Sequence, residues 1–240
     1  MPQTPESFTE ELKKIFGGNL RSAVLFGSAV SGGHHKDYSD FNLLVVLERW
    51  DMPACKAAAK PTRAWTKAGN PVPLIFTDEE LHRSGDVFPI ELLDMQDHRR
   101  VLQGEDPLAH YKPNSQNLRL ELERDLRSNL FKLRQACLAV SDDPKKTREL
   151  LIRAGSTFLV LFRAALRFLK ASPLPPKPEL AQALSKHISF DPEVFAYIER
   201  LKGKDKTALK ESPDPWMERL LEAVGKVTEA VDSWADKNIT

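Results

Sequence analysis

The segment that decides the fold of this chain is Leu25-Phe-Gly-Ser-Ala-Val-Ser-Gly-Gly-His-His-Lys-Asp-Tyr-Ser-Asp-Phe-Asn-Leu-Leu-Val-Val-Leu47. An apolar strand ends at Gly27-Ser28, a turn with a short helix follows, and a second apolar strand begins at Asp40. Free backbone N–H groups and the Ser28 hydroxyl at such a strand end can hold a phosphate, and Gly27 allows the backbone to approach a ligand closely. Because side chains alternate along a strand, Asp40 and Asn42 should project to the same side. The segment therefore predicts a phosphate pocket beside two oxygen-bearing side chains.

The residues that flank this segment predict a mixture of strands and helices. Short β-rich runs alternate with helical patterns, and Gly, Pro, Asp and Ser separate them. The expected strands cover residues 23–26, 41–47, 72–76 and 88–95. A first helix is expected at the start of the chain, where Phe8, Leu12 and Ile15 fall on one face. A second should follow Pro53 and run towards Trp65, with Pro61 as a candidate break, and a third should start at Thr77, where Glu80 completes a capping box. This pattern is typical of an α+β fold with a mixed sheet flanked by helices, over residues 1–112.

The second part of the chain has the periodicity of helices throughout. Apolar residues recur at alternating spacings of three and four within residues 126–140, 151–168 and 217–234. Asp142-Asp143-Pro144 marks a turn, and two shorter helices are expected near 179–187 and 191–201. Residues 115–240 are therefore expected to form an all-α helical bundle.

The composition excludes several classes of protein. The 240 residues include 35 Lys and Arg against 34 Asp and Glu, so the chain lacks the basic excess of a protein that binds long nucleic acid. No stretch reaches the roughly 18 uncharged apolar residues that span a membrane. The first 16 residues do not have the pattern of a secretory signal, and the two cysteines lack the spacing of a zinc site or a disulfide framework. We expect a soluble, cytoplasmic protein with free thiols and no membrane or long nucleic acid among its partners.

The opening segment resembles the nucleotidyltransferase superfamily with the DNA polymerase β-like fold, in particular its small bacterial kanamycin-nucleotidyltransferase-like branch with a C-terminal helical bundle. In that family a hydrophobic residue and Gly-Ser are followed, about a dozen residues later, by Asp, a hydrophobic residue and a second carboxylate on a strand. Phe26-Gly27-Ser28 and Asp40-Phe41-Asn42 match this pattern, except that Asn42 replaces the second carboxylate. The resemblance also implies a third carboxylate on a later strand, which we assign to residues 88–95 with Glu91 as the first choice and Asp94 as the second.

The resemblance implies transfer of a nucleoside monophosphate from a nucleoside triphosphate to a hydroxyl of a small molecule or protein, with Mg²⁺ as the cofactor. Gly27 and Ser28 would bind the nucleotide, and Asp40, Asn42 and Glu91 would be the catalytic and metal-binding residues. Because an amide carries no charge, a weakened Mg²⁺ site is expected. The alternative is a catalytically weakened or inactive nucleotidyltransferase-like binding protein, such as the antitoxin-type half of a two-protein assembly. The sequence leaves open the acceptor, the preferred base, and whether the chain forms a homodimer or binds a partner protein.

Overall fold

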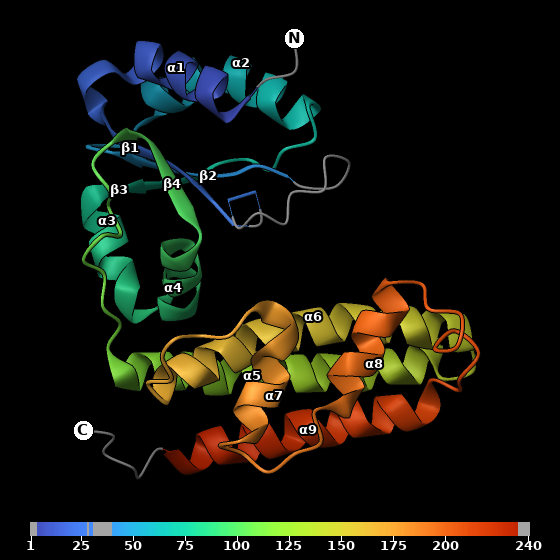
Figure 1. Cartoon of the computed structure of the whole chain (residues 1–240). Coiled ribbons are helices and arrows are strands. Elements are labelled where there is room, and N and C mark those ends of the chain that lie inside the picture. The colour runs from blue at the N-terminus through green and yellow to red at the C-terminus, as the bar shows by residue number, and fades with distance from the viewer. Residues whose placement is uncertain (1–3, 28, 31–39, 235–240) are drawn as a thin grey trace. The chain divides into compact units, whose positions relative to one another are not determined.

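A computed structural model describes residues 4–27, 29–30 and 40–234 of the chain. The chain divides into two compact units, Met1–Asn114 and Ser115–Thr240 (Figure 1). The first unit contains a mixed sheet with helices, and the second is helical, which confirms the expected α+β fold class.

The sheet of the first unit has four strands in the order β3-β2-β1-β4. The strands are β1 (Leu20–Phe26), β2 (Asn42–Leu47), β3 (Leu74–Thr77) and β4 (Arg99–Gly104). The central strand β1 pairs antiparallel with both β2 and β4, whereas β2 and β3 are parallel. The sheet is therefore mixed, and β3 and β4 are its outer strands.

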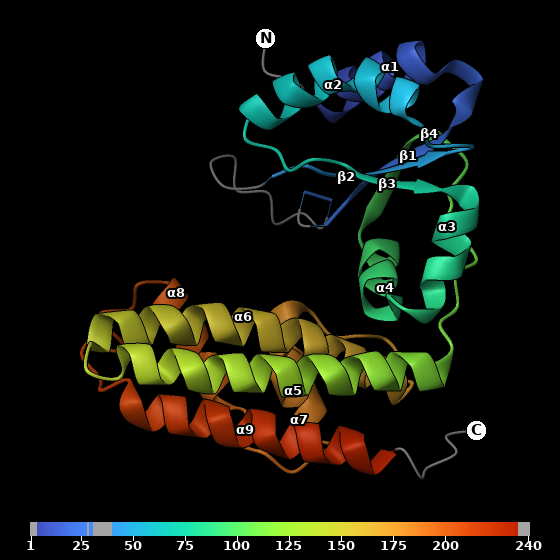
Figure 2. The ribbon, with the colours of Figure 1, turned by 180° about the vertical axis from the view of Figure 1, so that it is seen from behind.

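Helices cover both faces of this sheet, as Figures 1 and 2 show. On one face, α1 (Pro5–Phe16) and α2 (Met52–Lys67) bury Phe8, Leu12 and Trp65 against Leu43, Val45 and Leu47 of β2. On the other face, α3 (Asp78–Arg83) and α4 (Pro89–Asp97) bury Leu81, Leu92 and Met95 against Val24, Leu44 and Val46. Odd and even positions of β2 thus face different helices, which follows from the alternation of side chains along a strand. The short 3₁₀ turns Gly17–Asn19 and Ser84–Asp86 complete the unit.

Local signals in the sequence explain where several of these helices begin. Thr77 and Glu80 form the expected capping box, in which each side chain accepts a hydrogen bond from the other residue's backbone N–H. The Asp51 side chain caps α2 by accepting from the backbone N–H of Ala54. Pro61 does not break α2. Pro61 is itself buried, and the fully buried Trp65 anchors the helix one turn later.

The expected strand over residues 88–95 is wrong, because this segment forms α4. Pro89 occupies the first turn of the helix, where a missing N–H costs nothing. The apolar residues are also spaced for a helix: Leu92 and Met95 lie three residues apart, as do Ile90 and Leu93, and all four are buried. In contrast, β4 follows directly after α4 and was not expected, since its sequence Arg-Arg-Val-Leu-Gln-Gly has only two apolar residues.

The second unit is the expected helical bundle. It consists of α5 (Ser115–Val140), α6 (Pro144–Phe168), the 3₁₀ turn Lys177–Glu179, α7 (Leu180–Ser185), α8 (Glu193–Lys202) and α9 (Asp214–Ser233). The turn at Asp142-Asp143-Pro144 is confirmed, and Asp143 caps α6 by accepting from the backbone N–H groups of Lys145 and Lys146. These hydrogen bonds to the carboxylate lower the pKa of Asp143.

No helix in the described part of the chain is both long enough and apolar enough to cross a membrane.

Candidate functional site

Three strand ends meet at one end of the sheet in the first unit, which we call the sheet edge. Phe26, the last residue of β1, pairs with Asn42 at the start of β2 and with Arg99 at the start of β4. The next residue, Gly27, donates a backbone hydrogen bond to the carbonyl oxygen of His98 over 2.9 Å. The end of the Gly-Ser strand and the beginning of the strand after Asp40 are therefore brought together, as the sequence pattern predicts.

Gly27 occupies a backbone conformation that favours glycine, with φ of 85°. A Cβ atom at this position would stand 3.4 Å from Nδ2 of Asn42, so the two residues of the motif are direct neighbours. The Gly27 carbonyl accepts a hydrogen bond from Val30 N–H over 3.0 Å, which closes a tight turn after β1. Ser28, the other proposed nucleotide-binding residue, lies outside the described residues.

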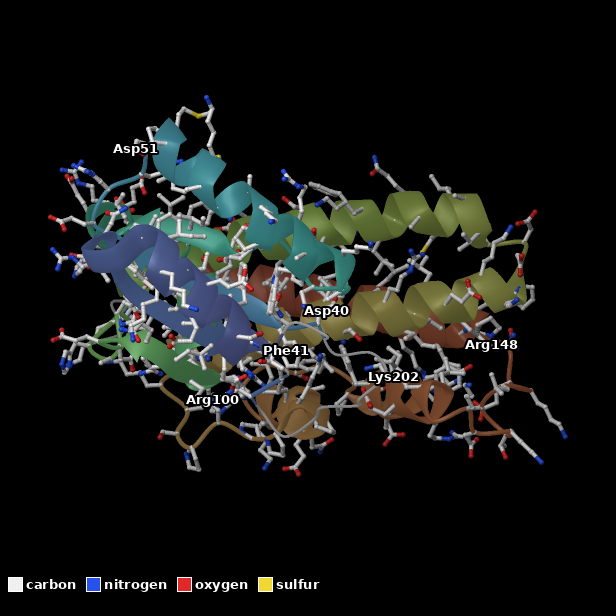
Figure 3. The ribbon with its side chains drawn as sticks, turned by 90° about the horizontal axis from the view of Figure 1, so that it is seen from above. Asp40, Phe41, Asp51, Arg100, Arg148 and Lys202 are labelled. Carbon is white, nitrogen blue, oxygen red and sulfur yellow. The ribbon has the colours of Figure 1, made fainter. Side chains whose placement is uncertain are left out.

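Asp40 and Asn42 lie at the beginning of β2. Asp40 is exposed and precedes the strand, while Asn42 is its first residue and is half-buried. The side chain of Phe41, between them, packs towards Trp65 on the α1–α2 face of the sheet, with ring centroids 6.3 Å apart. Figure 3 shows Asp40 and Phe41 near the end of α2. Alternation places Asn42 on the opposite face, with Leu44 and Val46, which is the face covered by α4.

Glu91, the proposed third carboxylate, lies on α4 instead of on a strand. It is exposed and lies in the first turn of the helix, six residues before Asp97 at the other end. At 1.5 Å per residue this corresponds to about 9 Å along the helix axis. The Gly27–His98 hydrogen bond lies beyond the Asp97 end. Asp94, the second choice, is half-buried and lies about one turn closer to that end.

The strands that follow β2 offer no replacement for this carboxylate. In the described part of the chain, β3 reads Leu-Ile-Phe-Thr and β4 reads Arg-Arg-Val-Leu-Gln-Gly, and neither contains Asp or Glu. Asp40 is therefore the carboxylate that the motif itself supplies at this edge, and two residues later, at the start of β2, stands the neutral amide of Asn42.

Arg99 is a cation at the same edge, but its charge is already compensated within the unit. Its guanidinium makes an ion pair of 2.6 Å with Asp106 and also donates to the carbonyl oxygen of Gln96 at the end of α4. The hydrogen bonds from Arg99 lower the pKa of the Asp106 carboxyl. This pair ties the turn after β4 to the start of the strand, so we assign Arg99 a structural role.

Asn70 also belongs to this edge, although the sequence pattern did not identify it. Its side-chain oxygen Oδ1 accepts a hydrogen bond from the backbone N–H of Phe41 over 3.1 Å. The residue lies in a Gly69-Asn70-Pro71 turn, which reads as an ordinary loop, and its partner is 29 positions away in the chain. Such a contact depends on how β2 and the segment before β3 lie against each other, which a local pattern does not specify.

Comparison with known proteins agrees with this geometry. The family described as nucleotidyltransferase domain matches residues 6–100, which is the part of the chain that contains the sheet edge. The resemblance seen in the sequence is therefore confirmed for residues 6–100, which match the nucleotidyltransferase domain family. No curated protein matches the sequence.

Seven chains of solved structures match this chain, and one of them contains ATP and spectinomycin. It is the crystal structure of spectinomycin adenyltransferase AAD(9) from Enterococcus faecialis with ATP and spectinomycin. The TM-score is 0.51 at 14% sequence identity, and the match covers 91% of this chain and 98% of the other. At this identity the similarity establishes a common fold that includes the helical unit.

Proposed function

We propose that this chain binds a nucleoside triphosphate at the sheet edge formed by Gly27, Asp40 and Asn42 and transfers the nucleoside monophosphate to a hydroxyl group. The observation that carries the proposal is that the two halves of the motif lie next to each other. Gly27, with its positive φ, lies beside Asn42, and the Asp40 carboxylate lies two residues earlier on the same chain segment. A turn with an accessible backbone next to a carboxylate is an arrangement that suits a phosphate group and its cation.

In this proposal Gly27 and Ser28 bind the phosphates through backbone N–H groups and the serine hydroxyl. Asp40 is the anionic ligand for Mg²⁺, and the amide oxygen of Asn42 is a neutral ligand. Mg²⁺ in such enzymes neutralises the developing charge on the phosphate and orients the reacting oxygens. Oxygen donors are the ligands that this ion prefers, and it is commonly held by one or two carboxylates together with substrate phosphates. The exposed Asp40 carboxylate and the Asn42 amide therefore fit one such ion, held largely by the nucleotide itself.

The third carboxylate, if it takes part, comes from α4. Glu91 remains the first choice, and its carboxylate would help to hold the ion and polarise the attacking hydroxyl. Asp94 is the alternative, since it lies about one helical turn closer to the sheet edge. In either case the carboxylate projects from a helix, so its distance from Asp40 is set by the packing of α4 against the sheet.

The amide at position 42 makes the proposed metal site weak. A unit charge about 4 Å from another contributes on the order of 4 kcal/mol at an effective dielectric constant of 20, before bound waters reduce the difference. Replacing a carboxylate by an amide removes this contribution for each positive charge of the ion. We therefore expect Mg²⁺ to bind mainly together with the nucleotide.

We propose a small molecule or a protein as the acceptor. The nearly equal numbers of acidic and basic residues argue against long nucleic acid. The structural relative with the same fold is an adenyltransferase whose structure contains ATP and spectinomycin, a small molecule. A small acceptor is consistent with both observations.

A second candidate function is a nucleotidyltransferase-like binding protein without catalytic activity. The observation that favours it is the absence of Asp and Glu from β3 and β4 within the described residues, together with the amide at position 42. Such a protein would still bind a nucleotide at the Gly27 turn, but its affinity would depend little on Mg²⁺. It would not release pyrophosphate.

Calorimetric titration of ATP and GTP, each with and without Mg²⁺, tests the proposal. We expect Mg²⁺ to tighten nucleotide binding by the unchanged chain, and we expect Asp40→Asn to remove this gain. Glu11→Gln is the matched control because it removes one exposed carboxylate from α1 in the same unit. Binding that is indifferent to both Mg²⁺ and Asp40→Asn would favour the non-catalytic alternative, and the absence of nucleotide binding would contradict both.

A further inference from the structure

The sheet stops before it reaches Asp40 on the β3 side. The parallel β2–β3 ladder begins at the pair Leu44 and Leu74. Carried three residues back, the same register would set Phe41 beside Pro71. Pro71 and Pro73 have no backbone N–H, so this segment cannot donate the hydrogen bonds of a regular ladder at those positions. The segment that contains Asp40 therefore needs another anchor on this side.

The Asn70 side chain supplies that anchor. Its Oδ1 accepts from the Phe41 backbone N–H over 3.1 Å, and its Nδ2 donates to the Trp65 carbonyl oxygen over 3.4 Å. The amide thus takes the place of a backbone peptide beside β2 and connects the strand to the end of α2. The Pro71 carbonyl is used in turn by the Trp65 indole, which donates to it over 2.7 Å. Trp65 thereby holds both the Asn70 side chain and the backbone of the next residue.

Burial makes this connection stiff. Asn70 is only 9% exposed, and Trp65 is fully buried between Phe8, stacked at 4.7 Å, and Phe41. A buried amide that loses its partner is costly, because water cannot replace the lost hydrogen bond. The Phe41 backbone is consequently held both by its N–H and by its ring, and Asp40 and Asn42 are its immediate neighbours.

We propose that Asn70 is a positioning residue for the nucleotide site, which rests on the function proposed above. By fixing the Phe41 backbone, Asn70 sets where the Asp40 carboxylate and the Asn42 amide stand relative to the Gly27 turn. Asn70 itself bonds to the backbone and does not act on the nucleotide. The cation-dependent part of nucleotide binding depends on Asp40, so this part should depend on Asn70. The contribution of the Gly27 turn to phosphate binding should not depend on Asn70.

The variant Asn70→Ala tests this inference, with Asn19→Ala as the matched control. Asn19 binds the backbone at the other end of β2, where its Oδ1 accepts from Arg49 N–H over 3.0 Å and its Nδ2 donates to the Arg49 carbonyl over 3.1 Å. We expect Asn70→Ala to weaken nucleotide binding in the presence of Mg²⁺ about tenfold. If the Phe41 backbone must be ordered on binding, the free-energy cost of ordering that one residue corresponds to about this change in affinity. Binding without Mg²⁺ should change less than about twofold, and Asn19→Ala should leave both affinities unchanged.

Amide hydrogen exchange gives a second readout that does not involve a ligand. In Asn70→Ala the Phe41 amide should exchange faster while the amides of residues 43–47 keep their protection. Asn70→Asp retains an acceptor oxygen, so it should restore much of the protection of Phe41. A purely structural role would instead lower the melting temperature and weaken binding equally with and without Mg²⁺.

Three results would overturn the inference. The first is Mg²⁺-dependent affinity in Asn70→Ala equal to that of the unchanged chain. The second is an equal loss with and without Mg²⁺, and the third is unaltered exchange at Phe41. Failure of the proposed function is recognised separately, because the unchanged chain would then show no Mg²⁺-dependent nucleotide binding, and the role of Asn70 would fall with it.

Discussion

Gly27 and Asn42 lie next to each other at the end of the β1–β2 ladder, and they have different roles there. Gly27 turns the chain away from β1 with a positive φ that other residues adopt only with strain. Asn42 supplies an oxygen without a charge. The sequence motif predicts that these two segments lie together, and the antiparallel β1–β2 ladder, which pairs Phe26 with Asn42, shows the register in which they meet.

The first prediction concerns Gly27→Ala. Alanine rarely adopts the positive φ of this position. Its Cβ atom would also stand 3.4 Å from the Asn42 amide nitrogen. We expect the free energy of unfolding to fall by about 1–2 kcal/mol in urea denaturation. Gly18→Ala is the control, since an added Cβ there has no atom within 4 Å, and its effect should stay within about 0.5 kcal/mol. Equal stability of the two variants would contradict the strained geometry of the Gly27 turn.

Asn70 shows what remained hidden at the scale of single residues. Its importance comes from the register of β2 and β3 and from two prolines that interrupt the ladder. A side chain that replaces a missing backbone partner has no characteristic spacing in the sequence. It can be recognised only after the strands are placed.

At the scale of secondary structure elements, the sequence patterns predicted most of the helices and the two inner strands of the sheet. Helix α1, the Thr77 capping box of α3, the strands β1 and β2, and the long helices of the bundle follow from their patterns. The pattern failed at α4, which buries two sides and therefore has an almost continuous apolar run that also fits a strand. It also failed at β4, where pairing with β1 defines the strand and the local sequence is mostly polar.

The wrong element changed the interpretation of the site. On a strand, Glu91 would share the sheet edge with Asp40, whereas on α4 its position depends on helix packing. The third carboxylate was therefore the least predictable member of the site, because its placement combines an ambiguous pattern with a tertiary contact.

A prediction for the bundle follows from two helical glycines. A Cβ on Gly155 of α6 would stand 2.6 Å from Cδ1 of Ile198 on α8, a fully buried side chain, whereas a Cβ on Gly225 of α9 has no atom within 4 Å. Gly155→Ala should lower the free energy of unfolding by about 1–2 kcal/mol, because the cost of overpacking exceeds the gain in helix propensity. Gly225→Ala should raise it by up to about 1 kcal/mol. Stabilisation by both variants would show that α8 does not depend on the absence of a side chain at position 155.

At the scale of the whole molecule, the chain combines a unit that matches the nucleotidyltransferase domain family with a helical unit, and each unit has its own buried core. The change from alternating strands and helices to continuous helical periodicity predicted both kinds of unit. From the balanced charge we expect no long nucleic acid among the partners. The chemistry of the acceptor could not be predicted, because the motif contains only the residues proposed to bind the nucleotide.

The measurement that tests the central claim most directly is calorimetric titration of nucleotide with Mg²⁺ into the unchanged chain and into Asn42→Asp. If Gly27, Asp40 and Asn42 form a weakened metal–nucleotide site, the restored carboxylate should tighten Mg²⁺-dependent binding at least about tenfold, even after solvent screening of the added charge. Asn19→Asp, which adds the same charge next to the other end of β2, should have no such effect. Equal or weaker nucleotide binding by Asn42→Asp, together with a lower melting temperature without ligand, would mean that the added charge has no ion to pair with and would contradict the metal-site account.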